Sequence, residues 1–413
     1  MNKNIRFAVP DVGCLEKQLI EAAIDTRQLT LGKYVYDLEN KISELSCCDR
    51  AVCFDSCTAA LEMSLRVLEI GPGDEVITTP FTYSATAEII RNTGAKIVFA
   101  DLAPSGFEMD YNQVYDLITE RTKAIIPVDY AGKLCNYDTL YKIIMAKQGL
   151  FRPSSSLQSA IGRIAIVADA AHSFMATQNG KVSGQFADFT CFSFHAVKVV
   201  TTGGEGGAVV WKNIPGFEND SIEKNFRFLG DHGQTSRDKS KGWEYDIALF
   251  GYNHIMTNID AAMGLAQISR IGELQEKRRA VTCRYDKYID TICKCCGVEK
   301  QILHIGQNYE SAMHLYPISI PSDSFYKGDE KRNKIYSILA EFGIPCNVHY
   351  KPLPMMTAYK NIGFDIKDFP HAYERFRTLL TIPYHTNLTD EEQIYITEHI
   401  VKAMQICDKY ICK

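Results

Sequence analysis

Two residues in the middle of the chain, Asp169 and Lys198, have side chains that together suit one kind of chemistry. The aspartate follows an apolar run at 164–168, and the lysine lies among apolar and small residues just before a glycine-rich segment at 203–207. Burial lowers the pKa of a lysine and makes its amine a nucleophile and a base. A lysine that forms a Schiff base and an acid that keeps a pyridine nitrogen protonated are the two groups that pyridoxal phosphate chemistry needs from a protein.

Taken singly, both residues have ordinary explanations. A lone lysine is nearly always a solvated surface residue, and an aspartate at a strand end is frequently the N-cap of the next segment. A phosphate group needs backbone N–H groups and hydroxyls at the N-terminus of a helix. The segment Ser56-Cys57-Thr58 offers both, because an apolar helix is predicted from 59 to 68 directly after it.

The elements that must position these residues alternate along the chain. Short apolar runs alternate with helical patterns, and the strands predicted from them lie at 51–54, 75–79, 96–100, 124–128, 164–168, 188–192 and 207–211. Such alternation predicts an α/β fold with a mostly parallel sheet between helices on both faces. Ligands bind such sheets at the carboxyl ends of the strands, and Asp169 and Ser56 both lie at predicted strand ends.

The remainder of the chain predicts a second, smaller α/β unit. A long helix is expected from 259 to 289, then a strand at 312–320 and helices at 332–341 and 390–407. Thr389 and Glu392 have the spacing of a capping box at the start of the last helix. Because 413 residues exceed what one core usually holds, we expect a large domain at 1–265 and a smaller C-terminal domain at 266–413.

The segment 149–163 has the composition of a loop, with Pro153 followed by three serines. It joins a predicted helix to the strand that ends at Asp169, so it enters that strand at its amino end, away from the expected site. We interpret it as a peripheral insertion that offers an interaction surface and carries no chemistry.

Composition excludes several classes of function. The net charge of −5 and the pI of about 6.1 give no basic surface for nucleic acid. No apolar run is long enough to span a bilayer, and the first residues lack the apolar core and cleavage site of a signal peptide. We therefore expect a cytoplasmic protein without a membrane partner.

The chain has 14 cysteines, whose placement argues against a disulfide framework. Several lie in adjacent pairs or in apolar runs, where thiols of a cytosolic protein are usually reduced and behave as small core residues. The cluster at 293–296 lacks a second group of Cys or His at the spacing of a zinc site, so we expect no metal.

The blocks Asp169-Ala170-Ala171-His172 and Phe192-Ser193-Phe194, followed by Lys198, resemble the DegT/DnrJ/EryC1/StrS family of aminotransferases, which act mostly on keto-sugars. The resemblance extends from Thr30 to the final helix. It implies the large two-domain fold of the pyridoxal-phosphate-dependent transferases of the aspartate aminotransferase type (fold type I), a Schiff base on Lys198 and a bond from Asp169 to the pyridine nitrogen. Family members that work as sugar dehydratases have histidine at the position of Lys198.

The resemblance also implies roles for further residues. Tyr83 would stack on the pyridine ring, His172 would lie near its phenolic oxygen, and Asn253 would cross a homodimer interface to the partner's cofactor phosphate. His349 and Tyr350 would line the entrance for substrate. The expected cofactor-binding set is Ser56, Cys57, Thr58, Tyr83, Asp169, His172, Ser193, Lys198 and Asn253.

Three of the positions that depart from the family pattern bear on phosphate binding. Cys57 replaces a glycine, which the turn tolerates only if it needs no positive φ. Ile255 stands where an arginine is usual, and Gly230 where arginine or lysine commonly precedes the aspartate. Because Arg and Lys bind phosphates, the two missing charges bear on how a substrate's diphosphate is held.

The resemblance predicts a homodimeric aminotransferase with shared active sites that moves an amino group from glutamate or glutamine to a keto-sugar. The sugar is expected to be nucleotide-linked and deoxygenated, for surface polysaccharide or a secondary metabolite. One alternative acceptor is a cyclitol ketone or a keto-sugar phosphate, which needs less diphosphate binding. An alternative of another class is a non-catalytic regulatory or binding protein that retains the fold. A pyridoxal phosphate lyase acting on sulfur amino acids is disfavoured by the keto-sugar resemblance.

Overall fold

A seven-stranded sheet forms the centre of the computed structural model, which describes residues 4–235, 243–321, 326–327 and 329–411. The strand order is β1-β9-β8-β5-β4-β2-β3, and all neighbouring pairs from β8 to β3 are parallel. β9 runs antiparallel to β1 and to β8. The strands are β1 (Arg50–Phe54), β2 (Glu75–Thr78), β3 (Lys96–Phe99), β4 (Thr122–Ile126), β5 (Ala165–Asp169), β8 (Phe189–Ser193) and β9 (Gly207–Trp211).

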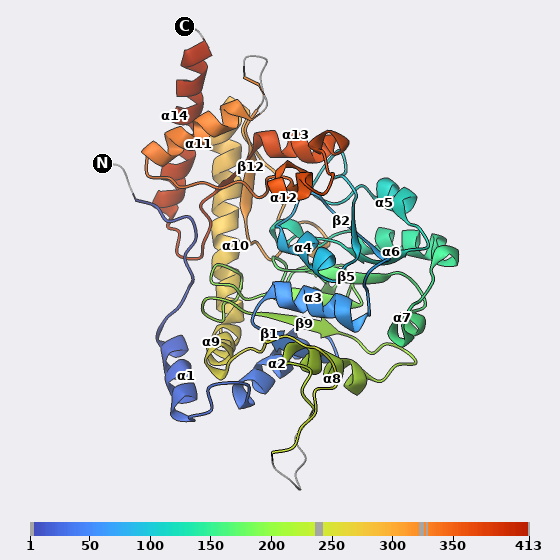
Figure 1. The fold of residues 1–413 in the computed structure, drawn as a ribbon. Coiled ribbons are helices and arrows are strands. Elements are labelled where there is room, and N and C mark those ends of the chain that lie inside the picture. The colour runs from blue at the N-terminus through green and yellow to red at the C-terminus, as the bar shows by residue number, and fades with distance from the viewer. Residues whose placement is uncertain (1–3, 236–242, 322–325, 328, 412–413) are drawn as a thin grey trace.

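Both faces of this sheet are buried under helices (Figure 1). Side chains alternate between the faces of a strand: in β9, Val209 and Trp211 belong to one core cluster and Ala208 and Val210 to another. The helices of this region are α1 (Cys14–Asp25), α2 (Lys33–Leu45), α3 (Cys57–Val67), α4 (Ala85–Asn92), α5 (Tyr111–Leu117), α6 (Tyr137–Ala146), α7 (Ser156–Ile161), α8 (Asn219–Gly230) and α9 (Asn258–Ser269). The predicted mostly parallel sheet between helices is confirmed.

The C-terminal part packs around its own apolar cluster. It contains an antiparallel sheet of order β10-β12-β13, with β10 (Glu299–Lys300), β12 (Tyr316–Ser319) and β13 (Leu379–Ile382). Its helices are α10 (Ile271–Tyr288), α11 (Glu330–Glu341), α12 (Thr357–Lys360), α13 (Pro370–Thr378) and α14 (Asp390–Ile411). In Figure 1, α10 runs from the region of α9 up to α11 and α14. The division at residue 265 stays a prediction; that position lies within α9.

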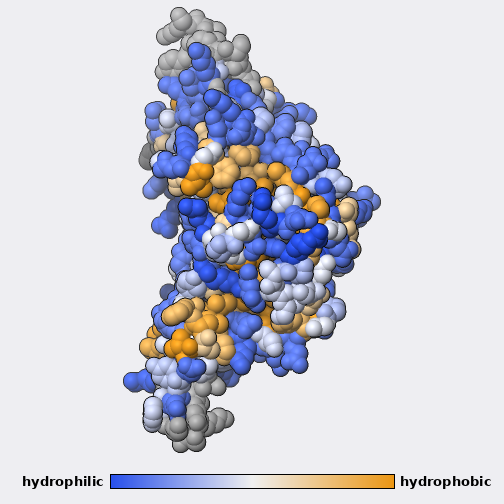
Figure 2. Space-filling view, turned by 45° about the vertical axis from the view of Figure 1, so that its right-hand side comes forward, coloured by the Kyte–Doolittle hydropathy of each residue, from blue (hydrophilic) through white to orange (hydrophobic). Residues whose placement is uncertain are grey.

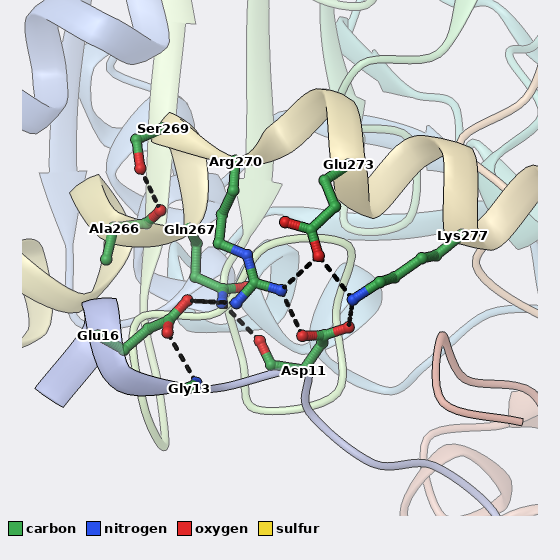
Figure 3. A network of polar contacts seen from close by, with 9 residues as sticks. All are labelled: Asp11, Gly13, Glu16, Ala266, Gln267, Ser269, Arg270, Glu273 and Lys277. Atoms are coloured by element: carbon green, nitrogen blue, oxygen red, sulfur yellow. Dashed lines mark hydrogen bonds and ion pairs between the residues drawn. The ribbon is translucent and has the colours of Figure 1, made fainter.

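The long helix predicted from 259 to 289 is interrupted. It consists of α9 and α10, separated at Arg270, whose φ of −115° and ψ of 20° leave the helical region. At this break, Arg270 forms ion pairs with Asp11 and Glu16 of the N-terminal segment, and Gln267 donates hydrogen bonds to the same two residues (Figure 3). The polar contacts with the N-terminal segment thus lie at the break between α9 and α10. The hydrophobic periodicity of the sequence does not reveal this break.

The predicted strand at 312–320 is shorter in the structure. β12 begins at Tyr316, because Met313 adopts a positive φ of 51° that a sheet ladder does not accommodate. A third, small sheet of order β11-β6-β7 joins β6 (Thr177–Gln178) and β7 (Lys181–Val182) to β11 (Tyr309–Glu310), and the sequence did not indicate it.

The segment 149–163 contains the helix α7 rather than a loop throughout. Ser155 caps this helix by accepting a hydrogen bond from the Gln158 N–H, and Gly162 ends it in the left-handed conformation. Ser155 Oγ and Gln158 Nε2 both donate to the carbonyl of Leu68 at the end of α3. The segment therefore closes the C-terminal end of α3.

None of the helices within the described residues is long and apolar enough to cross a membrane.

Candidate active site

Asp169 lies at the carboxyl end of β5, where the strand-end rule places a ligand site. It is 7% exposed. Its Oδ2 accepts a hydrogen bond from Thr86 Oγ1 at 2.6 Å, and its Oδ1 accepts one from the Ala171 N–H at 3.2 Å. Burial raises the pKa of Asp169, and these two donors and the nearby Lys198 act in the opposite direction. The carboxyl group is thus fixed in orientation in a poorly solvated place.

Lys198 lies in the turn that follows β8, and its N–H donates to the carbonyl of His195 at 2.9 Å. Burial lowers the pKa of the Lys198 amine, while the nearby groups of Cys57 and Asp169 raise it. The structure therefore brings together the two residues from which the sequence argument started. An amine with a lowered pKa is available as a nucleophile nearer to neutral pH than a surface lysine.

The N-terminus of α3 lies at the same edge of the sheet. Ser56 is its N-cap, with Oγ accepting from the Ala59 N–H at 3.1 Å. Cys57 is the first helical residue and is not among the residues with positive φ, so the replacement of glycine is compatible with the turn. Gly207, at the start of β9, approaches so closely that a Cβ there would lie 2.3 Å from the Cys57 nitrogen.

His172 has a defined hydrogen-bonding pattern. The Ala131 N–H donates to its Nδ1 at 3.3 Å, and its Nε2 lies 3.2 Å from the hydroxyl of Tyr350. Burial lowers the pKa of His172, so the ring is neutral at pH 7. Because a backbone N–H can only donate, Nδ1 is the acceptor, and we assign the ring proton to Nε2, facing Tyr350.

Two tyrosines form the outer part of the site. The rings of Tyr83 and Tyr350 lie 6.3 Å apart, and Tyr83 is 66% exposed. The neighbouring His349 makes other contacts: its Nδ1 lies 3.1 Å from Thr381 Oγ1 and its ring stacks on Phe7. Of the two predicted substrate residues, Tyr350 is therefore the one in hydrogen-bond contact with His172.

Of the remaining predicted residues, Ser193 is buried and Asn253 is exposed. Ser193 ends β8 and accepts a long hydrogen bond, 3.4 Å, from the His195 N–H. Asn253 is exposed, beside His254, whose Nδ1 lies 2.9 Å from Asp55 Oδ2. The carboxylate of Asp55 raises the pKa of His254.

Sequence reasoning missed Thr86 and His314. Thr86 is fully buried in the first turn of α4, and a threonine there carries no signal of its bond to Asp169. The ring of His314 lies 4.5 Å from that of His172. A histidine near the start of a predicted strand gives no indication of such a contact, because the packing joins segments that are far apart in the sequence.

Two surface hollows lie apart from these residues. One, of about 610 Å³, is lined by the β6–β7 hairpin and residues 305–310, and another, of about 510 Å³, by residues near the amino ends of β2 and β3. Neither includes Lys198 or Asp169. Within the described residues, no group of three or more His, Cys, Asp or Glu side chains could hold a metal ion.

The donor set at the carboxyl edge suits pyridoxal phosphate: an amine and a carboxylate in a poorly solvated place, a helix N-terminus and an exposed aromatic ring. A mostly parallel sheet with this set is the architecture of a pyridoxal-phosphate-dependent aminotransferase of fold type I. The chain belongs to the DegT/DnrJ/EryC1/StrS aminotransferase family, whose model matches residues 10–401.

Its relatives agree with this assignment. The spore coat polysaccharide biosynthesis protein SpsC of Bacillus subtilis is 30% identical over 95% of each chain. The UDP-4-amino-4,6-dideoxy-N-acetyl-beta-L-altrosamine transaminase of Helicobacter pylori is 28% identical over 98% of each chain. Among solved structures, Spr1654 of Streptococcus pneumoniae, assigned as a sugar aminotransferase, superposes in its PMP form with a TM-score of 0.94 at 41% identity over the whole of both chains.

The predicted family, fold class, cofactor and enzyme class are confirmed: the protein is a pyridoxal-phosphate-dependent sugar aminotransferase that takes a small-molecule amino donor and a sugar acceptor. The alternative of a non-catalytic protein is not supported.

Proposed function

We propose that the enzyme transfers an amino group from glutamate, or glutamine, to a ketone on a nucleotide-linked deoxysugar, for surface polysaccharide or a secondary metabolite. The observation that carries the proposal is the convergence of Lys198, Asp169 and the N-terminus of α3 at one edge of the sheet. The acceptor class is supported by the relatives, one named for spore coat polysaccharide biosynthesis and one for a UDP-linked dideoxy sugar.

In this proposal each residue has a distinct task. When bound, pyridoxal phosphate supplies the electron-accepting ring that carries the amino group between donor and acceptor. Lys198 binds the cofactor and afterwards holds and returns the proton at its Nζ. Asp169 keeps the pyridine nitrogen protonated from its fixed carboxylate. The N–H groups of Cys57 and Thr58, with the hydroxyls of Ser56, Thr58 and Ser193, would hold the phosphate.

The other residues shape the site around the ring. Tyr83 would cover one face of the ring, and its exposed side chain is accessible for that contact. His172 donates from Nε2 toward the phenolic oxygen or to Tyr350. Tyr350 and His349 lie at the entrance for substrate, the second as part of its wall.

A second acceptor class, a keto-sugar phosphate or a cyclitol ketone, is favoured by the two missing charges. Gly230 has no space for a longer side chain, since a Cβ there would lie 2.9 Å from the ring of Phe54. Ile255 forms a bridge with Phe54 and brings no charge. Comparing kcat/KM on a nucleotide-linked ketone and on the same ketone as a sugar phosphate distinguishes the two classes.

We also propose a homodimer with shared active sites. The segment after α8 exposes large apolar side chains, among them Trp243 at 74% and Phe250 at 98%, an unusual amount for a surface left in water. Figure 2 shows hydrophobic surface just above the grey atoms at the lower tip of the molecule. Asn253 follows this segment directly, which suits a residue that reaches a partner's phosphate.

The cytoplasm is the proposed location. The 13 cysteines that the structure describes are free thiols, as is usual for proteins kept in a reducing compartment.

The proposal is tested by the visible spectrum of the purified enzyme beside a Lys198→Ala variant. We expect a yellow band with pyridoxal phosphate, its absence in Lys198→Ala, and its loss when glutamate is added to the wild type. Borohydride reduction followed by peptide mass spectrometry should place the cofactor on Lys198. A variant that retains the band and the adduct would refute the assignment of this lysine.

A further inference from the structure

Arg278, on α10, is a buried arginine that contacts the main chain of Lys198. It is 8% exposed, and its Nη2 donates to the Lys198 carbonyl at 3.1 Å. Its Nη1 donates to the carbonyl of Met313 at 3.3 Å. The next residue, Arg279, behaves differently: its side chain is 43% exposed and forms an ordinary ion pair with Glu310.

The surroundings of Arg278 are unusual for a buried charge. Among the residues that the structure describes, no carboxylate forms an ion pair with its guanidinium, and its Nε has no hydrogen-bond partner. A buried cation without a carboxylate is costly unless oriented dipoles solvate it. Here that solvation comes from two main-chain carbonyls. The guanidinium therefore holds main-chain segments in place and does not pair with another side chain.

The two carbonyls belong to parts of the site that are far apart in the sequence. One is that of Lys198 itself. The other is that of Met313, which has the strained φ of 51° and precedes His314, whose ring contacts His172. Arg278 therefore joins the lysine turn to the segment that supports His172. The planar fork of arginine can reach two acceptors at once, which the single ammonium of lysine does less well.

The helix that carries Arg278 is itself anchored on both sides. Asp11 accepts hydrogen bonds from Arg270 and from Lys277 (Figure 3). These two bonds attach the N-terminal segment to α10. The hydroxyl of Tyr384 donates to the Arg278 carbonyl at 2.9 Å. The position of the guanidinium is thus determined by the fold rather than by its own flexibility.

We propose that Arg278 is a positioning residue that holds the main chain of Lys198 so that the amine faces the cofactor site. This inference rests on the proposed role of Lys198. Without the Arg278 side chain, the turn at 195–202 relaxes, and the Lys198 amine spends less time in the reactive geometry. The contacts of the donor substrate are unchanged.

The test compares Arg278→Lys and Arg278→Met with the matched control Arg279→Lys. Cofactor-free protein is mixed with pyridoxal phosphate, the growth of the visible band gives the rate of capture, and borohydride reduction identifies the lysine. The rate of the glutamate half-reaction, followed over a range of glutamate concentrations, gives its maximal rate (written kcat below) and its half-saturating glutamate concentration (written KM below) separately. Thermal unfolding monitors the fold.

We expect both Arg278 variants to capture the cofactor about tenfold or more slowly and to lose about 10- to 100-fold in kcat, because small misplacements of a reacting group have effects of this size. KM for glutamate should change less than about twofold, since uniform binding is untouched. The Arg279→Lys variant should match the wild type in all measurements.

Two outcomes overturn the inference. One is a folded Arg278→Lys variant with wild-type capture and kcat. The other is failure of both Arg278 variants to fold while Arg279→Lys folds, which assigns Arg278 to folding alone. Failure of the proposed function is separate, because wild-type protein would then show no adduct on Lys198.

Discussion

The bond from Thr86 to Asp169 offers a quantitative test of how the site is built. The change is Thr86→Val, which keeps the branched shape and removes the hydroxyl. In the structure, Thr86 Oγ1 lies 2.6 Å from Asp169 Oδ2, and the two residues are 0% and 7% exposed. The single hydroxyl proton of Thr86 goes to the carboxylate, so the contact of 2.8 Å with Thr82 is a bond that Thr82 donates.

The expected loss of stability follows from the charge and the burial of the Asp169 carboxylate. A hydrogen bond to a charged group contributes about 1.5–3 kcal/mol, and a buried carboxylate cannot replace it with water. Thr82 also loses its acceptor, which adds to the cost. We therefore expect the free energy of unfolding of the cofactor-free protein to fall by about 2–3 kcal/mol at pH 8.

The pH dependence has a definite sign. Burial raises the pKa of Asp169 above its ordinary value of 3.8, so the native state holds this proton more tightly than the unfolded state. The contribution of the carboxyl to stability is therefore greatest at low pH and declines as the pH rises through the native pKa. Removing the donor raises that pKa further, so the loss in Thr86→Val should be larger at pH 8 than at pH 5.

Urea unfolding at both pH values measures this effect, with Thr86→Ser as the control that keeps a hydroxyl. The reasoning is refuted if Thr86→Val loses less than about 0.5 kcal/mol, the size of an ordinary surface substitution. It is also refuted if the loss is the same at pH 5 and pH 8.

Two further substitutions address the phosphate site and the assembly. Gly207→Ala would place a Cβ 2.3 Å from the Cys57 nitrogen, so β9 must move away from α3. Overpacking of this kind costs about 1–3 kcal/mol of stability. Fluorescence titration should show that this variant binds pyridoxal phosphate more weakly. The neighbouring Gly204→Ala, where a Cβ meets open space, should bind it normally. Phe250→Asp places a charge on the most exposed apolar side chain of the proposed interface and should shift the mass in sedimentation equilibrium from dimer toward monomer; an unchanged mass would argue against this interface.

The family assignment could be made from the sequence because its evidence is local. Asp169 and Lys198 each lie in a short block whose residue types are set by the chemistry, and the strands around them are apolar runs with clear ends. Alternation of strands and helices then predicts a mostly parallel sheet, and the carboxyl ends of its strands predict where these blocks meet. The structure has this sheet, with Asp169 at the carboxyl end of β5 and Lys198 in the turn after β8.

Contacts between distant segments were decided only by the tertiary structure. The partner of Asp169 is Thr86, 83 positions away, and the partner of the Lys198 carbonyl is Arg278, 80 positions away. The break at Arg270 likewise arises where the N-terminal segment meets the helix. Local propensity and periodicity describe neighbours along the chain, whereas a buried polar group is satisfied by whichever donor the packing brings to it. The sequence therefore determined which chemistry the chain performs, and the packing determined which side chains hold the reacting groups in place.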